Sequence, residues 1–321
     1  MTTEPSSESP APPDSRLPRP EGLVSRIFLG SDGLRVGWSL LLYAAFWVMM
    51  EYAVGMVVLL AGFRVNANSP QSVVLEDLRS FLSAYAAAVL MARLERRRAG
   101  VYGLPVRRAF GGSFWLGILL GLGEVSLLVG LIAACGGYSF GTVVLQGSTL
   151  LDGGALWALA FVLVGLSEEF LFRGYTQYTL ARGIGFWPAA ACLSLVFGAA
   201  HLGNPGEGTV GAANVVVTGL VFALALRRTG NLWLAVGWHA SFDFGETFLF
   251  SVPNSGYVFD QHLSSAVLHG KTWLTGGTVG PEGSVFGFLT LGISALLIHY
   301  LFPAKKHPSN APLNSPETAA C

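Results

Sequence analysis

Charged residues are scarce in this 321-residue chain. Asp, Glu, Lys and Arg make up 12% of it, whereas hydrophobic residues make up 52%. A soluble domain carries about 25% charged residues. So few charges cannot coat a water-soluble globule, which excludes a soluble enzyme, a nucleic-acid-binding protein and a disordered chain. The formal net charge is zero, so no overall field attracts an anionic partner.

Cysteine is scarce as well. The three cysteines, Cys135, Cys192 and Cys321, are too few and too scattered for a disulfide framework or a zinc finger. The class of protein that remains is a membrane protein, and the few charges inside its apolar segments become the features to explain.

Long apolar runs fill most of the chain. A transmembrane helix needs about 20 mostly apolar residues, and eight stretches qualify: 36–63, 73–94, 113–135, 155–182, 186–202, 210–226, 232–251 and 284–302. The runs are continuous rather than alternating, which argues against transmembrane strands. The sequence therefore predicts an all-α, polytopic membrane helix bundle of about eight transmembrane helices.

The predicted spans form one domain, residues 34–303, between two polar tails. Residues 1–33 are rich in Pro, Ser and Glu and are expected to be disordered, and residues 304–321 form a second tail. With a cytoplasmic N-terminus, fifteen of the 19 Lys and Arg residues fall in cytoplasmic segments. By the positive-inside rule we expect both termini to be cytoplasmic. The Ala-, Gly- and Arg-rich composition favours a bacterial plasma membrane.

The fourth span contains the run Ser-Glu-Glu-Phe-Leu-Phe-Arg at residues 167–173. A charge in the hydrocarbon costs about 2.5–3.5 kcal/mol, so each one needs a partner or a purpose. Glu169 and Arg173 stand four residues apart in the order that favours an ion pair. Glu168 points about 100° away from Glu169 on a helix and is predicted to be the carboxylate left for chemistry. In the alternative, both glutamates only neutralise Arg173.

The fifth span ends in Phe197-Gly-Ala-Ala-His201. The midpoint between Glu168 and His201 falls at the Gly-Ile-Gly break of residues 183–185. An antiparallel hairpin folded at that break brings Glu168 and His201 to the same depth, which favours a functional pair. In the alternative, His201 is a satisfied polar residue in the packing.

The seventh span carries His239-Ala-Ser-Phe-Asp243. The two ionisable residues share one helix face, and Glu246 lies near that face and is expected to support the site. In the alternative, Asp243 only orients the ring of His239 through a local hydrogen bond, which is also how catalytic and metal-binding histidines are oriented.

Two hydrolytic chemistries fit these residues. In the first, Glu168 and His201 hold and deprotonate a water that attacks an amide carbonyl, while His239 and Asp243 stabilise the oxyanion. In the second, Glu168, His201 and His239 bind zinc and leave one position for water. The sequence has no His-Glu-x-x-His run. We favour the route without a cofactor and keep zinc as the alternative.

In this order the three motifs resemble the CPBP family of intramembrane endopeptidases, which includes the CAAX prenyl protease 2 enzymes and bacterial Abi and bacteriocin-processing proteins. The family pattern is Glu-Glu-x-x-x-Arg, then Phe-x-x-x-His, then His-x-x-x-Asn or Asp. The resemblance covers about residues 150–250. It implies hydrolysis of a peptide bond in a membrane-associated or lipidated peptide or protein, at a site open to the membrane and the cytoplasmic side.

Carried over from the family, Glu168 is the base, His201 helps to hold the water, and His239 with Asp243 forms the oxyanion site. Glu169, Arg173, Phe197 and Glu246 are then expected to support these four. Asp243 stands where the prenyl proteases have Asn. An ionised Asp repels an oxyanion. Asp243 must therefore be protonated, orient His239 or bind a metal, and metal binding would favour the zinc alternative.

Two other classes of protein are open at this point, a non-catalytic immunity or scaffold protein and, less favoured, an ion-coupled transporter. The segment 252–283 is expected to be a solvated loop, with a lid as the alternative. Glu51, Glu124 and His299 are expected to pair with neighbours or to reach toward a membrane surface.

Overall fold

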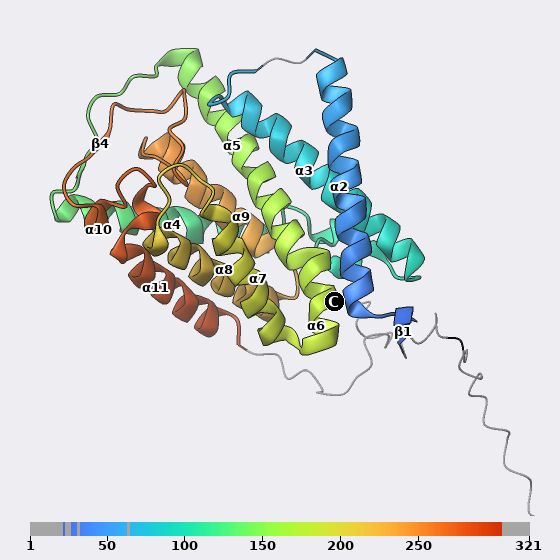
Figure 1. Ribbon diagram of the computed structural model, residues 1–321. Coiled ribbons are helices and arrows are strands. Elements are labelled where there is room, and N and C mark those ends of the chain that lie inside the picture. The colour runs from blue at the N-terminus through green and yellow to red at the C-terminus, as the bar shows by residue number, and fades with distance from the viewer. Residues whose placement is uncertain (1–21, 23–26, 31–32, 63–64, 304–321) are drawn as a thin grey trace, which may run out of the picture.

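The computed structural model describes residue 22 and residues 27–30, 33–62 and 65–303 (Figure 1). Nearly all of the predicted disordered tail, and the whole of residues 304–321, lie outside the described residues. The described part is mostly helical, which confirms the predicted all-α class.

The long helices follow the predicted spans. They are α2 (Val36–Leu60), α3 (Pro70–Leu94), α4 (Gly112–Ala134), α5 (Gly147–Glu169), α6 (Thr176–Ile184), α7 (Phe186–His201), α8 (Thr209–Thr229), α9 (Trp233–Phe244) and α11 (Val285–Leu301). A π-helical segment, η3 (Phe170–Tyr175), joins α5 to α6, and another, η4 (Gly245–Leu249), continues α9. Every predicted span is helical, with bounds within about three residues except at the start of the fourth, which begins at Gly147 rather than at residue 155.

The remaining elements are short. The one-turn helices are η1 (Ala99–Tyr102), η2 (Val106–Arg108), α10 (Thr272–Thr275) and η5 (Pro281–Gly283). The two-residue strands pair antiparallel, β1 (Leu29–Gly30) with β2 (Gly33–Leu34), and β3 (Tyr138–Ser139) with β4 (Val267–Leu268). The second pair ties the connection after α4 to the long segment before α11.

Four helices in the described part are long and apolar enough to cross a membrane: Val36–Leu60, Gly112–Ala134, the continuous Gly147–Ile184 and Thr209–Thr229. Helices α7 and α11 are apolar but shorter. Helix α3 carries Glu76, Asp77 and Arg79 near its start, and α9 is short. The count of eight spans therefore stays a prediction.

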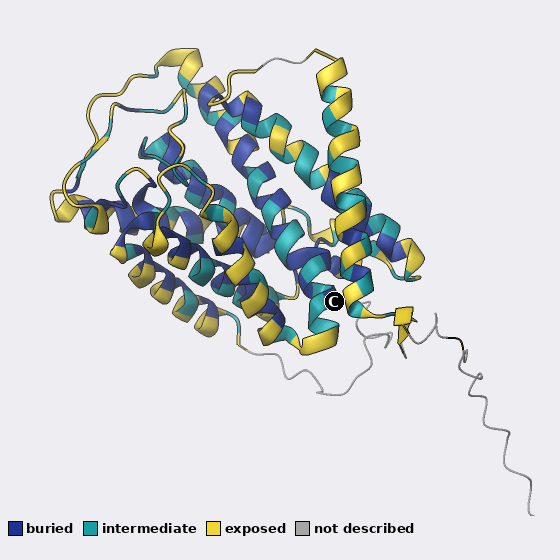
Figure 2. Cartoon of the chain, viewed as in Figure 1, coloured by how far each residue is buried: buried dark blue, intermediate teal, exposed yellow. Residues whose placement is uncertain are grey.

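Helix α2 lies at one edge of the bundle against α3, and exposed residues run along most of its length (Figures 1 and 2). Of its 25 residues only Ser39 and Tyr43 are buried. An apolar helix with so much exposed surface is expected to face lipid.

Helix α9 occupies the centre of the bundle because small residues let its neighbours approach it closely. A Cβ added to Gly117 or Gly121 of α4 would collide with the backbone of α9, and one added to Gly237 of α9 would collide with Phe114 of α4. Gly165 of α5 lies in the same way against Val236. Such close backbone contact between helices is typical of membrane bundles, and it fixes α9 between α4 and α5.

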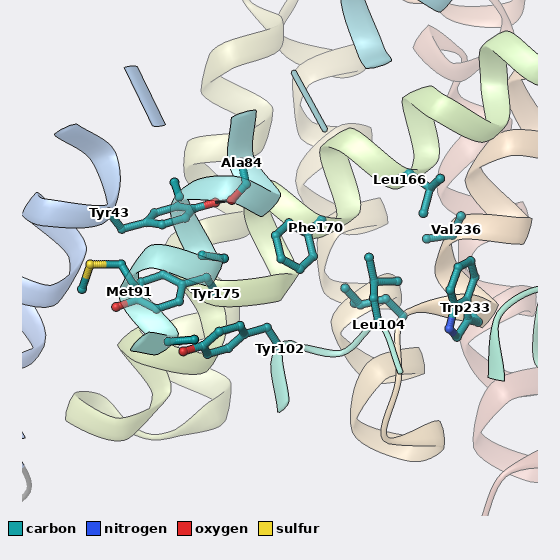
Figure 3. Packing of buried hydrophobic residues seen from close by; sticks show 14 of the residues in the cluster. Tyr43, Ala84, Met91, Tyr102, Leu104, Leu166, Phe170, Tyr175, Trp233 and Val236 are labelled. Atoms are coloured by element: carbon teal, nitrogen blue, oxygen red, sulfur yellow. Dashed lines mark hydrogen bonds between the residues drawn. The ribbon is translucent and has the colours of Figure 1, made fainter. Parts of the chain in front are cut away.

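An aromatic cluster anchors η3 (Figure 3). The ring of Tyr175 stacks on Tyr43 with centroids 4.5 Å apart and meets Tyr102 edge-on at 5.0 Å. Phe170 packs against Tyr85 of α3. Rings from α2, α3 and η1 therefore hold the segment that carries Arg173.

Candidate active site

The predicted hairpin break is present. Helix α6 ends at Ile184, and Gly185 adopts φ of 87° before α7 begins at Phe186. This left-handed conformation is open to glycine at little cost. The helical segments on either side of this break, η3 with α6 and α7, pack side by side. Glu168 and His201 line the same cavity, as predicted from an antiparallel hairpin folded at this break.

This cavity brings together all four residues predicted to be catalytic. Its volume is about 530 Å³, and Glu168, His201, His239 and Asp243 line it. The Glu168 side chain keeps 31% of its surface exposed, compared with 13% for His239 and 12% for Asp243. Their catalytic roles stay predictions.

Three carboxylates surround the ring of His239. Its Nδ1 lies 3.2 Å from Oε1 of Glu169, whereas its Nε2 lies 3.7 Å from Glu168 and 3.6 Å from Asp243. The Nδ1 distance is that of a weak hydrogen bond, and the Nε2 distances exceed hydrogen-bond length. Glu169, rather than Asp243, therefore orients the ring, and Nε2 stays available toward the cavity.

The predicted ion pair between Glu169 and Arg173 is present. Nη1 of Arg173 lies 3.0 Å from Oε1 of Glu169, and both side chains are buried, with 2% and 0% of their surface exposed. One carboxylate oxygen thus serves both Arg173 and His239. This is a contact that the sequence spacing did not reveal.

The second motif supports His201 through Phe197. Nδ1 of His201 lies 2.8 Å from the backbone oxygen of Phe197. A carbonyl oxygen only accepts, so Nδ1 carries the proton and donates it. In the neutral ring, Nε2 is then left as an acceptor. The Phe197 ring packs against His201 at 4.6 Å and lies beneath the guanidinium of Arg173 at 4.3 Å.

Two residues of α3 also belong to the cavity lining. Glu76 and Asp77 line it, and Ser167 donates a hydrogen bond of 2.6 Å to Asp77. Neither acid was singled out from the sequence. The available signal was two carboxylates at the start of an otherwise apolar helix.

The expectation that 252–283 is a solvated loop is wrong for part of its length. Val252 and Asn254 are each 6% exposed, and Ser264 is fully buried. Asn254 donates to the backbone oxygen of Asp243 and to Thr247, because the chain turns back over the end of α9. Tyr257 and Phe259 line the cavity as well.

A smaller cavity of about 80 Å³ shares His201, His239 and Asp243 with the larger one. Glu124, Glu246 and Glu282 line it, and Glu246, which is 1% exposed, is there rather than in the larger cavity. Burial raises the pKa of Glu282, which lies in the loop outside the spans, above its usual range. Glu282 was not singled out from the sequence, because no pattern in the residues around it indicates burial.

The other intramembrane charges have neighbours, as expected. Glu51 pairs with Arg79. Glu124 accepts a hydrogen bond of 2.8 Å from the Trp238 indole, and His299 lies 2.9 Å from Arg228.

The residues of the zinc alternative do not form a ligand sphere as they are placed. Within the part of the chain that is described, no group of three or more His, Cys, Asp and Glu side chains is arranged to hold a metal ion. Glu168, His201 and His239 line one cavity but do not converge on a point.

Residues 151–245 match a family model described as type II CAAX prenyl endopeptidase, Rce1-like. The match confirms the resemblance that the three motifs predicted, and it runs from α5 to the end of α9, the segment that carries all four residues predicted to be catalytic. No curated protein and no solved structure matches the chain. The match and the four apolar helices together support an integral membrane protein with a segment similar to type II CAAX prenyl endopeptidases.

Replacing Arg173 by Gln should destabilise the protein, because it leaves Glu169 buried without its cation. Breaking a buried pair costs about 3–5 kcal/mol. Thermal unfolding in detergent measures this, with Arg108→Gln as the control at an exposed position. The double variant Glu169→Gln/Arg173→Gln should lose less stability than the sum of the losses in the two single variants. An Arg173→Gln protein that unfolds at the wild-type temperature would contradict the assignment.

Proposed function

We propose that this protein is an intramembrane endopeptidase that hydrolyses a peptide bond of a membrane-associated or lipidated peptide or protein. The observation that carries the proposal is the single cavity lined by Glu168, His201, His239 and Asp243. The segment that supplies these residues is the one that matches a CAAX prenyl endopeptidase model. A scaffold needs buried ion pairs but no open carboxylate, and Glu168 is open to the cavity.

In the proposed reaction, Glu168 is the general base. Its carboxylate takes a proton from a water whose other hydrogen is held by Nε2 of His201, the nitrogen left as an acceptor by the bond to Phe197. The water oxygen bonds to the carbonyl carbon of the substrate. Glu168 then gives the proton to the amide nitrogen as the carbon–nitrogen bond breaks, which yields a carboxylic acid and an amine. The acid loses its remaining proton to the amine, so the final products are a carboxylate and an ammonium group.

His239 is the proposed oxyanion donor. Its Nδ1–H donates to Glu169, so Nε2 carries a hydrogen toward the cavity only when the ring is a protonated imidazolium, the form that the carboxylates of Glu169, Glu168 and Asp243 around it favour. A donor held in place before the reaction stabilises the developing charge without reorganisation. Asp243 can add a second hydrogen bond only when its carboxyl is protonated.

The cellular setting is also part of the proposal. We propose one transmembrane domain over residues 34–303, with both termini cytoplasmic, in a bacterial plasma membrane. The distribution of Lys and Arg and the composition support this. No cofactor is required by the proposed steps, and zinc is the alternative that a chelator distinguishes.

Glu168→Gln should abolish peptide cleavage while the protein stays folded, because an amide cannot take the proton of the water. We expect a loss of about 10²–10⁴-fold or more. The assay uses purified protein in liposomes with a pool of prenylated and unprenylated membrane peptides, read by mass spectrometry. Asp152→Asn, at an exposed position of α5, is the matched control. Cleavage by Glu168→Gln at the rate of this control would refute the proposed base.

Asp243→Asn should keep wild-type cleavage or exceed it, whereas Asp243→Leu should lose at least about tenfold. The amide is a hydrogen-bond donor at every pH, and leucine supplies none. The pH profile of cleavage distinguishes the wild type from the Asn variant. Any decline in the wild-type rate that stems from ionisation of Asp243 should be absent from the Asn variant. If Asn and Leu are equally inactive, position 243 acts as a carboxylate and not as an oxyanion donor.

A further inference from the structure

A separate cavity lies beside η3, away from Glu168 and His201. Its volume is about 620 Å³, and its lining includes Arg173, Arg182, Arg227, Gln177, Tyr102 and Tyr178. None of the described residues that line it is Asp or Glu. Three guanidinium groups and an amide therefore face one space without a lining carboxylate.

The lining residues differ in depth. Arg173 and Gln177 are 3% and 2% exposed and form the inner wall, whereas Arg227 is exposed and Arg182 keeps 13% of its side-chain surface open. The last two residues lie near the ends of α6 and α8, at positions that the distribution of Lys and Arg predicts to be cytoplasmic. The mouth of the cavity is thus expected at the cytoplasmic surface of the membrane.

Two buried donors in the inner wall have no acceptor. Nη2 of Arg173 and Nε2 of Gln177 make no hydrogen bond within the described part of the chain, nor does the hydroxyl of Tyr102. A buried polar group left unsatisfied costs about 1–3 kcal/mol. These atoms have almost no accessible surface, so they lie beneath the cavity wall, and Nη2 of Arg173 packs against Gly219 of α8.

The nearby carboxylates are already engaged. Glu169 binds the other arm of Arg173 at 3.0 Å. Glu95 accepts from Tyr175 at 2.8 Å, lies 3.4 Å from Arg97 and reaches Arg182 only at 3.9 Å. The guanidinium of Arg227 lies over the ring of Phe186 at 5.1 Å and has no ion pair among the described residues. The cavity therefore has an excess of positive charge.

We propose that this cavity binds a phosphate group, supplied by an anionic phospholipid headgroup or by free phosphate. The planar guanidinium matches phosphate oxygens with paired donors, and basic pockets between helices on the cytoplasmic side are suited to lipid headgroups. Arg227 and Arg182 bind the anion at the mouth, and Arg173 and Gln177 form the polar inner wall beneath it.

The position of Arg173 gives the site a consequence for the catalytic cavity. Its other arm binds Glu169, which binds Nδ1 of His239. A phosphate in the cavity beside Arg173 thus lies next to the contacts that lead through Glu169 to the ring. This consequence rests on the proposed function, but binding itself does not and is measured without a peptide substrate.

The test uses the full-length protein and thermal unfolding as its readout. One arm titrates phosphatidylglycerol into phosphatidylcholine nanodiscs in chloride buffer, and the other adds inorganic phosphate in a neutral detergent. We expect the unfolding temperature to rise with the ligand in at least one arm. A rise with lipid alone identifies the headgroup, a rise with phosphate alone identifies the free ion, and a rise in both shows that the phosphate group suffices.

Arg182→Gln/Arg227→Gln should weaken the apparent affinity about tenfold or more, because each arginine supplies a charge-assisted contact. Arg228→Gln is the matched control, since Arg228 contacts His299 and the Phe302 backbone and does not line the cavity. If the double variant does not fold, Arg227→Gln carries the test because its side chain is exposed. The proposal is overturned if neither ligand stabilises the wild type, or if these variants bind like the control.

Discussion

The buried guanidinium of Arg173, which needs a negative partner inside the bundle, holds the candidate active-site cavity together. Arg173 is buried, and Glu169 pairs with it from one turn earlier. The same carboxylate oxygen reaches His239 on α9, and the guanidinium lies over Phe197 on α7, which in turn holds His201. Because a buried cation without its partner is costly, this one ion pair fixes the relative position of three helices and of both histidines.

The pair also explains why two adjacent glutamates differ in role. Glu169 is fully buried and committed to Arg173 and His239, whereas Glu168, about 100° around the helix, faces the cavity with 31% of its side chain exposed. The chain then continues through η3, where Gly174 leaves helical geometry with ψ of −114°. Such π-helical segments often occur at functional sites.

Much of this arrangement could be predicted from local patterns. The apolar runs defined the helices, the spacing of Glu169 and Arg173 defined the ion pair, and the Gly-Ile-Gly break placed Glu168 opposite His201. What could not be predicted depends on contacts between distant segments. Asp77 enters the cavity only because α3 packs against Ser167 of α5. Glu282 is half-buried because the segment before α11 folds back over α9 and pairs with the chain after α4. The contact of Glu169 with His239 likewise depends on the close approach of α5 and α9 at Gly165.

We propose that side chains of this cavity, without a metal, activate the water that splits the peptide bond. The most direct measurement is cleavage of a membrane peptide by the purified protein in ¹⁸O-labelled water, with and without a strong chelator. The account predicts one ¹⁸O atom in the new C-terminal carboxylate and the same initial rate in both conditions. Loss of cleavage in the chelator, with recovery when zinc is added back, would contradict it.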